Sequence, residues 1–458
     1  MMSVSFLLLL FSVIFLLLLT GSAAFSCKGD DGKDVSWFVI EAMQKINEKK
    51  FSQDVLPNPN VDLSMIPSEM LRGARYLYAD KDHPTPTLSM HALDSKTSGS
   101  LPQTMTQHYS AYRSNADHFF IKWNDEMEKS KKILSSMPEW EEVFLGAGKC
   151  RKENGHLKGY LFGSETEGTF VLILVSTPTF GRRTIYKYSE HALRNAQQLV
   201  CLTLSRQQAP TVLNALYLMN AGINRASIPP WLLQGNNYFE IFNDATQREK
   251  FWALPANTPN LKTNTLTTID GTNFRWFVKP GTATEGNDIY RMVAENLGTS
   301  LWVRTWKTKT KDTKKCNTAQ QLMNIHQMSF LAKINDKTTV NITPATGKDH
   351  TKECYSTDPT KPWVCWCDLN REKSQYCRGG GCLCLEHGIL WKYYTDSILR
   401  KDVCAANEPP LLQELLDENV DEDENVREDE DKDEDSFIVR INLTYQVVAD
   451  SGQRKEEL

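Results

Sequence analysis

The chain has 458 residues, of which 40% are hydrophobic, and a formal net charge of -5 at pH 7. This composition excludes a low-complexity chain and supplies a large core in one or two domains. Residues 417–435 hold 13 acidic residues against two basic ones, a local charge of -11 that leaves +6 on the remainder. The basic remainder suits a polyanionic ligand, and the acidic segment would then compete with that ligand or shield it. Alternatively, the acidic segment only solvates the chain.

The sequence begins with an apolar run from Phe6 to Leu19, followed by small residues. This pattern predicts a secretory signal peptide over residues 1–24, cleaved near Ala23 or Ala24. A signal anchor is the alternative, because no basic residue precedes the run, but the run is short for a bilayer, which needs roughly 20 residues. After cleavage, no other segment is long and apolar enough to enter a membrane.

All eleven cysteines follow the signal, so export predicts disulfides, and the odd number leaves at least one thiol unpaired within the chain. Six cysteines lie between Cys354 and Cys384, which raises a zinc site as an alternative. Their two C-x-C motifs are tighter than the usual C-x2-C of zinc sites, which favours disulfides and no metal. Sequons at Asn341 and Asn442 predict N-glycosylation of an exported protein.

Apolar and polar residues are mixed along residues 27–407, and their local patterns predict a fold with both helices and strands. Strands are predicted at residues 169–175 and 300–306 and helices at 189–196 and 319–327. Residues 408–458 form an acidic tail that is predicted to be disordered.

The triplet His-x-Lys occurs twice, as His156–Lys158 in G-H-L-K-G and as His350–Lys352 in D-H-T-K. On a strand, residues i and i+2 project to the same face, so each triplet could point an imidazole and an ammonium into one pocket. Two such strands together could hydrolyse a phosphodiester without metal: one histidine attacks phosphorus, the other protonates the leaving oxygen, and the lysines hold the phosphate oxygens. The alternative for each triplet is an exposed loop or a structural histidine.

Further motifs surround both triplets. They are C-K-G-D-D-G-K-D-V-S-W-F-V from Cys27, S-T-P-T-F from Ser176, S-L-W-V-R-T-W from Ser300, P-W-V-C-W-C-D-L-N-R from Pro362 and R-G-G-G-C-L-C from Arg378. With the triplets, they resemble the deoxyribonuclease II family of acid endonucleases, which shares the duplicated His-x-Lys architecture of the phospholipase D superfamily. The resemblance covers residues 27–407 and does not include the acidic tail.

This resemblance implies a mixed αβ (α+β), pseudodimeric, phospholipase D-like fold. Its two αβ halves, at residues 25–205 and 206–407, would each hold a central mixed sheet and together form a U-shaped clamp. The implied activity is hydrolysis of double-stranded DNA at acid pH, without metal or cofactor, leaving 3'-phosphates. DNA is the implied partner, bound through its backbone, while the partner of the tail stays open. Secretion or delivery to lysosomes is the implied destination.

The resemblance also implies roles for single residues. His156 and His350 are the nucleophile and the general acid in an order left open, Lys158 and Lys352 bind phosphate, and Asn370 helps to hold it. Acid pH suits an imidazole that must be protonated, since imidazole titrates near pH ~6.5. The implied disulfides are Cys27–Cys201, Cys316–Cys404 and Cys365–Cys384. One more bridge is expected among the extra cysteines near the R-G-G-G turn, with its partners open.

Two positions depart from the family pattern, which has a His and an Asn where this chain has Val175 and Thr179. Thr179 can still donate a hydrogen bond to phosphate, but Val175 cannot, and losing one oriented donor can cost ~10²-fold in rate. The first half-site is therefore weakened. The alternatives to an active endonuclease are a catalytically weakened paralogue that binds nucleic acid or a host protein, and a phospholipase that uses the same chemistry.

The chain ends in Lys455-Glu456-Glu457-Leu458, which resembles the K-D-E-L retrieval signal of the endoplasmic reticulum. Retrieval through this tetrapeptide is one interpretation, and an ordinary charged terminus is the other.

Overall fold

The computed structural model describes residues 25–46, 66–114, 117–125, 154–178, 180, 185–233, 240–244, 254–255, 257–281, 287–306, 313–335 and 339–404. The predictions for the signal peptide, Cys150, Thr179, Asn442 and the tail concern residues outside these ranges. No helix within the described ranges is long and apolar enough to cross a bilayer.

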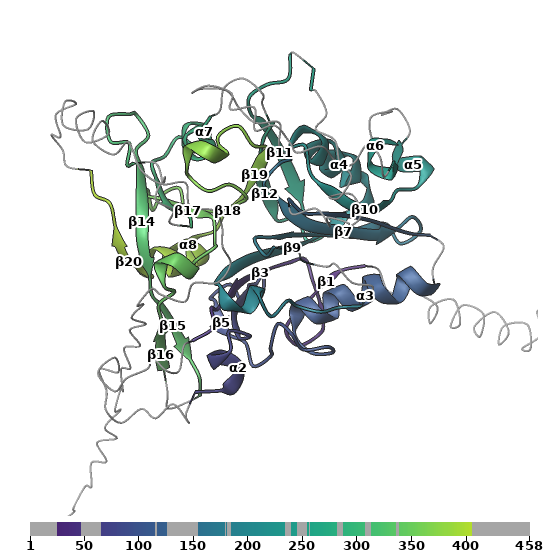
Figure 1. Cartoon of the computed structure of the whole chain (residues 1–458), viewed down its shortest axis with the longest axis horizontal. Helices are drawn as coiled ribbons and strands as arrows, with labels where there is room; N and C mark the ends of the chain where they lie inside the picture. Colours follow the sequence, from purple (N-terminus) through teal and green to yellow (C-terminus); the bar gives the residue numbers. More distant parts are fainter. Residues whose placement is uncertain are drawn as a thin grey trace, which may run out of the picture.

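One eight-stranded sheet is built from the first part of the chain (Figure 1). Its strands are β3 (Trp37–Ala42), β4 (Tyr76–Asp80), β5 (Thr87–Leu88), β6 (His118–Trp123), β7 (Lys158–Ser164), β8 (Thr169–Val175), β9 (Gln197–Ser205) and β10 (Ile223–Ser227). Their order is β10-β6-β7-β8-β9-β3-β4-β5, and every neighbouring pair is antiparallel. We call this the first sheet; it includes β10, which follows residue 205 in the chain.

The second sheet also has eight strands. They are β11 (Lys262–Thr267), β12 (Asn273–Lys279), β13 (Leu301–Arg304), β14 (Leu322–Met328), β17 (Glu353–Ser356), β18 (Trp363–Cys367), β19 (Gly380–Glu386) and β20 (Ile398–Lys401). The order is β11-β12-β19-β18-β17-β13-β14-β20, with one parallel pair, β13 and β14. Two short pairs complete the described strands, β1 (Cys27–Lys28) with β2 (Asp34–Val35) and β15 (Phe330–Lys333) with β16 (Thr339–Ile342).

The described helices are few and mostly short. They are α2 (Ser68–Leu71), α3 (Ser100–Ser114), α4 (Ala209–Leu218), α5 (Pro230–Leu233), α6 (Glu240–Asn243), α7 (Ile289–Leu297) and α8 (Gly388–Asp396). Two large sheets and a few helices confirm the mixed α and β class. The pseudodimeric phospholipase D-like arrangement of the halves stays a prediction.

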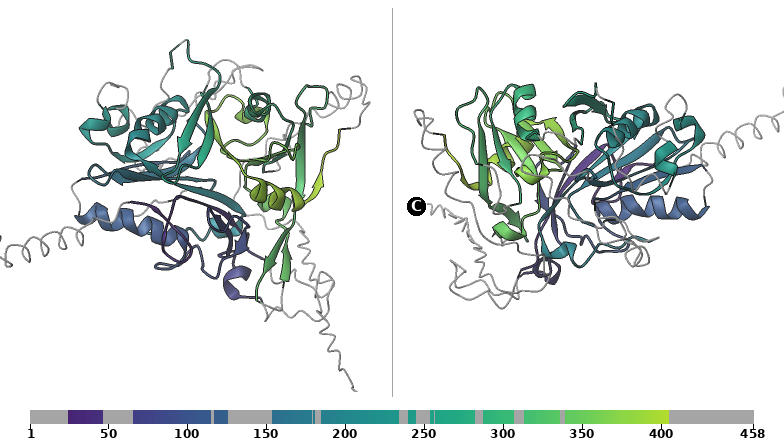
Figure 2. Two further views of the ribbon diagram at one scale, coloured as in Figure 1. Left: turned by 180° about the vertical axis from the view of Figure 1, so that it is seen from behind. Right: turned by 45° about the horizontal axis from the view of Figure 1, so that its top comes forward.

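Alternating side chains place the first sheet between two cores. Trp37 and Val39 of β3 enter one cluster, whereas Phe38 and Ile40 enter another, because successive strand residues point to opposite faces. Helix α3 covers one face of the first sheet and α4 the other (Figures 1 and 2). The core that contains α4 continues through β12 and β19 to α8, so the two sheets share one hydrophobic core.

The predicted strands are confirmed, and the predicted helices are wrong. Residues 169–175 form β8, and 300–306 contain β13. A helix is predicted at residues 319–327, but most of these residues form β14, between β13 and β20. Backbone pairing of β14 with a strand on each side outweighs the local helical preference of that segment. Of residues 189–196, only the single 3-10 turn Ala192–Arg194 is helical.

The three disulfides implied by the resemblance are formed, Cys27–Cys201, Cys316–Cys404 and Cys365–Cys384. The additional bridge is Cys367–Cys382, which lies beside Cys365–Cys384 on the same pair of strands, β18 and β19. Cys377 is also disulfide-bonded, and among the described cysteines Cys354 is the free thiol, fully buried in the core.

A buried histidine pair between α3 and β6 predicts that acid weakens the fold. His108 Nδ1 lies 3.0 Å from His118 Nε2, and Tyr160 Oη lies 2.7 Å from His108 Nε2. Burial lowers the pKa of His118 to about 4 and that of His108 to about 2. Because the unfolded histidines titrate near ~6.5, stability is complete above that pH and is lost as the pH falls toward 4, by up to about 1.4 kcal/mol per pH unit for each histidine.

We therefore expect the His118→Gln variant to lose less unfolding free energy than the wild type between pH 7 and pH 5. Urea unfolding at the two pH values measures this difference. Equal losses in the two proteins would show that His118 is not the residue through which acid acts.

Candidate active site

Two glycines bring the first triplet against the second half of the chain. A Cβ atom on Gly155 would lie 2.2 Å from the carbonyl oxygen of Met219, and one on Gly379 only 2.0 Å from it. Only glycine fits at either position. This close approach lets the backbone N–H of His156 donate to the carbonyl of Gly379 at 2.9 Å. The motifs G-H-L-K-G and R-G-G-G are thus packed together at the end of α4.

The side chains of the first triplet meet an aspartate that follows β6. His156 Nδ1 lies 2.7 Å from the backbone carbonyl oxygen of Asp368, and its Nε2 lies 3.3 Å from Asp125 Oδ2. Lys158 Nζ lies 2.7 Å from Asp125 Oδ1, and Arg378 Nη2 lies 3.8 Å from Asp125 Oδ2. Asp125 reaches the triplet because β6 and β7 are neighbours in the first sheet.

The second triplet is held by the first half of the chain. The N–H of His350 donates to the carbonyl of Ala196 at 3.0 Å, and the N–H of Lys352 donates to Gln198 Oε1 at 2.5 Å. Gln198 Nε2 in turn donates to the carbonyl of Cys367 at 2.8 Å. His350 and Lys352 lie just before β17 rather than within it, as His156 lies just before β7. Each triplet is thus fixed by groups of the opposite half.

The imidazole of His350 stacks on the indole of Trp306, with ring centroids 4.5 Å apart and an angle of 25° between the planes. Trp306 is itself fixed by Nε1, which donates to the carbonyl of Gly347 at 3.2 Å. An aromatic face favours a cation above it, so this stack favours the protonated imidazole.

Both triplets belong to one electrostatic site, because each shifts the pKa values of the other. Burial, followed by the charges of Lys158 and Lys352, lowers the pKa of His156 well below its usual value. Burial and then the charge of Lys352, with a smaller contribution from Lys158, lower the pKa of His350 to about 3. Burial and then Lys158 lower the pKa of Lys352 to about 7.

Two partly buried carboxyl groups in this site have pKa shifts of opposite direction. Burial raises the pKa of Asp368 to about 7, although its Oδ2 accepts a hydrogen bond from the N–H of Gly381 at 2.7 Å. Burial acts in the same sense on Asp125, but Lys158 and His156 outweigh it and hold the pKa of Asp125 below its usual value. Asp125 therefore stays ionised at acid pH, whereas Asp368 is protonated there.

Of the two supporting residues named from the sequence, Asn370 lies two residues after Asp368, and Thr179 is outside the described residues. Asn370 is buried, its N–H donates to Gln375 Oε1 at 2.6 Å, and its Oδ1 has no hydrogen-bond partner among the described residues. Val175 is buried directly opposite Lys158 in the β7–β8 register, where it places an apolar side chain beside the lysine strand. Among the described residues, no group of three or more His, Cys, Asp or Glu is arranged to hold a metal ion.

Sequence reasoning missed Asp125, Gln198, Trp306, Asp368 and Arg378. Trp306, Asp368 and Arg378 lie within quoted motifs, so the motifs could have suggested them. Asp125 and Gln198 lie outside any motif that we recognised, and only the pairing of strands brings them to the site.

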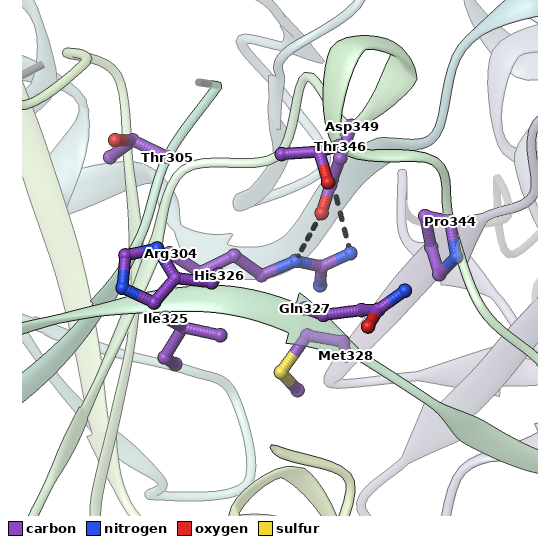
Figure 3. Close-up of a pocket in the computed structure, with 9 residues that line it drawn as sticks. All are labelled: Arg304, Thr305, Ile325, His326, Gln327, Met328, Pro344, Thr346 and Asp349. Carbon is purple, nitrogen blue, oxygen red and sulfur yellow. Dashed lines mark hydrogen bonds and ion pairs between the residues drawn. The ribbon is translucent and has the colours of Figure 1, made fainter. Parts of the chain in front are cut away.

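A pocket lies next to the segment that carries His350 (Figure 3). Arg304 and Asp349 line it, and the guanidinium of Arg304 binds both carboxylate oxygens of Asp349, at 2.8 and 3.1 Å. Arg304 also contacts Glu41 of the first sheet at 2.5 Å and Glu353 at 2.9 Å. One buried guanidinium thus joins β3, β17 and the residue before His350.

Comparison with known proteins then assigns the family. The family model for deoxyribonuclease II matches residues 26–404. The chain belongs to the deoxyribonuclease II family. This confirms the family resemblance and, with it, the enzyme class, a deoxyribonuclease II-like nuclease.

Several curated relatives match most of this chain. Deoxyribonuclease-2 of Caenorhabditis elegans is 30% identical over a match of 400 residues that covers 84% of this chain and 96% of that protein. Deoxyribonuclease-2-beta of Mus musculus is 24% identical and covers 84% of this chain and 94% of its own length. Deoxyribonuclease-2-alpha of Sus scrofa is 25% identical, with 83% and 90% covered.

Proposed function

We propose that this chain is an acid endonuclease that hydrolyses double-stranded DNA without a metal ion and leaves 3'-phosphates. The observation that carries the proposal is the crossed contact of the two His-x-Lys triplets. His156 contacts the carbonyls of Asp368 and Gly379, and Lys352 contacts Gln198, so each triplet lies against the opposite half of the chain. Two imidazoles and two ammonium groups supply a nucleophile, an acid and phosphate binding.

The proposed reaction has two steps. One imidazole attacks phosphorus through a ring nitrogen, the bond from phosphorus to the 5' oxygen breaks, and the other imidazole gives its proton to that oxygen. Water then attacks the phosphohistidine and loses a proton to the second imidazole, while the phosphorus–nitrogen bond breaks. Lys158 and Lys352 hold the non-bridging oxygens throughout, and Asn370 supports them.

The destination and the division of the chain belong to the same proposal. Residues 1–24 direct export, residues 25–205 and 206–407 form the two halves, and residues 408–458 form the acidic tail. The mature protein is secreted or delivered to lysosomes, or it is retrieved to the endoplasmic reticulum through Lys455–Leu458. Asn341, half-buried on β16, and Asn442 are the proposed glycosylation sites.

A second candidate function is a weakened paralogue that binds nucleic acid or a host protein without turnover. The observation that favours it is Val175, an apolar residue opposite Lys158 where the family pattern has a histidine.

Plasmid cleavage by the purified mature protein distinguishes the two candidates. The assay is run at pH 5 and pH 7.5 with excess chelator, beside the His350→Ala variant. Nicking at pH 5 that resists the chelator and vanishes in the variant supports the metal-free endonuclease. Lack of cleavage by well-folded protein would favour the weakened paralogue.

The pH dependence should follow Lys352 and Asp368 more than the histidines. Both histidine pKa values in the free protein lie below ~6.5, whereas Lys352 and Asp368 titrate near 7. As the pH rises through 7, Lys352 loses its positive charge and Asp368 gains a negative one, so the site becomes less attractive to phosphate.

We expect deprotonation of Lys352 to lower the DNA affinity by up to about tenfold between pH 6 and pH 8. One pH unit above the pKa of an amine, only about a tenth of the molecules carry the protonated amine. Fluorescence anisotropy with the inactive His350→Ala protein measures the affinity. Adding Lys352→Met should weaken binding at pH 6 and reduce the fall. Lys392→Met, at an exposed lysine paired with Asp396, is the control. An unchanged fall with Lys352→Met would contradict the prediction.

A further inference from the structure

The carboxylate of Asp125 lies at the centre of the first half-site. Its Oδ1 lies 2.7 Å from Lys158 Nζ, and its Oδ2 lies 3.3 Å from His156 Nε2 and 3.8 Å from Arg378 Nη2. The side chain of Asp125 is 10% exposed and that of Lys158 only 5%. A buried acid group is thus surrounded by three nitrogen donors.

These donors are the groups that a phosphodiester would need. Lys158 is the proposed phosphate ligand, and Nε2 is the nitrogen of His156 that is not engaged by the carbonyl of Asp368. One oxygen of Asp125 lies on the ammonium of Lys158, where a non-bridging oxygen of a bound phosphate would lie, and the other lies beside Nε2 of His156, the nitrogen that would face phosphorus or its leaving oxygen. A carboxylate that only oriented His156 would be expected at Nδ1, on the far side of the ring, where the Asp368 carbonyl already lies.

The ammonium of Lys158 also needs a counter-charge in the free protein. An ammonium as buried as that of Lys158 is costly to leave unpaired, by several kcal/mol. Asp125 supplies that charge in the free protein, and a phosphodiester carries the same single negative charge. An exchange of one for the other keeps the charge of the half-site constant.

We propose that Asp125 is a phosphate surrogate, which fills the position of the scissile phosphate in the free protein and is displaced from Lys158 and His156 when the substrate binds. This inference rests on the proposed function, because it takes Lys158 and His156 as the groups that receive the phosphate.

The test is the affinity of the full-length mature protein for inorganic phosphate at pH 5, measured by isothermal titration calorimetry. Asp125→Asn and Asp125→Ser remove the charge. Asp270→Asn is the matched control, because it makes the same charge change at an aspartate in the β11–β12 turn that contacts Lys81. We expect both Asp125 variants to bind phosphate at least about tenfold more tightly than the wild type and the control. They should also have a lower Tm without phosphate and recover it when phosphate is added.

Phosphate affinity no higher than that of the control would overturn the proposal and make Asp125 a positioning residue for His156. If neither variant folds, a phosphate complex of the wild-type protein at saturating phosphate decides. Asp125 should then have left Lys158, and a complex with the Asp125–Lys158 contact intact, or no phosphate at Lys158, would refute the proposal. Phosphate binding requires no cleavage, so a protein that fails to cut DNA can still support the surrogate, and an active enzyme can still refute it.

Discussion

Replacing His156 or His350 with alanine is expected to slow DNA cleavage at least about 10²-fold. Removing a general acid alone costs about 10² to 10⁴ in rate, and removing a nucleophile costs more. The two losses should not add in the double variant, because the histidines act on one phosphorus and the first loss already disables the reaction. Single-turnover cleavage of a labelled duplex at pH 5 measures each rate constant.

His83→Ala is the control for this experiment, since His83 is largely exposed and contacts Asp80 rather than either triplet. Circular dichroism and Tm must match the wild type before a loss is assigned to chemistry. A His156→Ala protein that keeps a tenth of the wild-type rate would show that the first triplet is not required for the reaction.

The same variants can resolve the order of the two histidines. A duplex with sulfur in place of the bridging 5' oxygen has a leaving group that needs little protonation. The variant that lacks the general acid should recover much of its rate on this substrate, and the variant that lacks the nucleophile should not. Equal recovery by both variants would contradict a division into nucleophile and acid.

Replacing Arg304 with methionine is expected to reduce the unfolding free energy at pH 7 by about 3–5 kcal/mol, the range for breaking a buried ion pair by removing one partner. Arg304 is 2% exposed and is the shared partner of Glu41, Glu353 and Asp349. Its loss leaves these acid groups buried together. Burial already raises the pKa of Glu41 well above its usual value even with Arg304 present.

The destabilisation should be smaller at pH 5, because protonation of the carboxylates removes their repulsion. Urea unfolding at pH 7 and pH 5 measures the difference. Arg275→Met is the control, since Arg275 is exposed and lies over the ring of Trp363. A loss below about 1 kcal/mol at pH 7 would show that the three acid groups tolerate the absence of the guanidinium.

The sequence indicated which residues to examine at the site, but not the contacts that position them. His156, Lys158, His350 and Lys352 could be named because the triplet recurs within recognisable motifs. Asp125 could not be, since it follows a different strand and reaches the site only through the pairing of β6 with β7. Local patterns correctly predicted β8, because its apolar run of residues 169–175 indicates a strand.

The same local patterns were wrong at residues 319–327. There a helical composition lies between two strands, and backbone pairing with β13 and β20 decides the structure. The extra disulfide has a similar cause. The spacing of cysteines left its partners open, whereas the register of β18 with β19 places Cys367 directly opposite Cys382.

Each triplet is held by residues of the opposite half, so the site cannot form until most of the chain has been synthesised. His156 is held by the carbonyls of Asp368 and Gly379, more than 200 positions further along the sequence, and Lys352 is held by Gln198. Under the proposed mechanism, a nascent chain that has not yet emerged as far as Gly379 lacks the contacts that hold His156, however well its first sheet has formed. The same holds for a fragment cut by a protease between the sheets, once its parts separate. The site is therefore completed only after nearly all of the described chain has been made and folded.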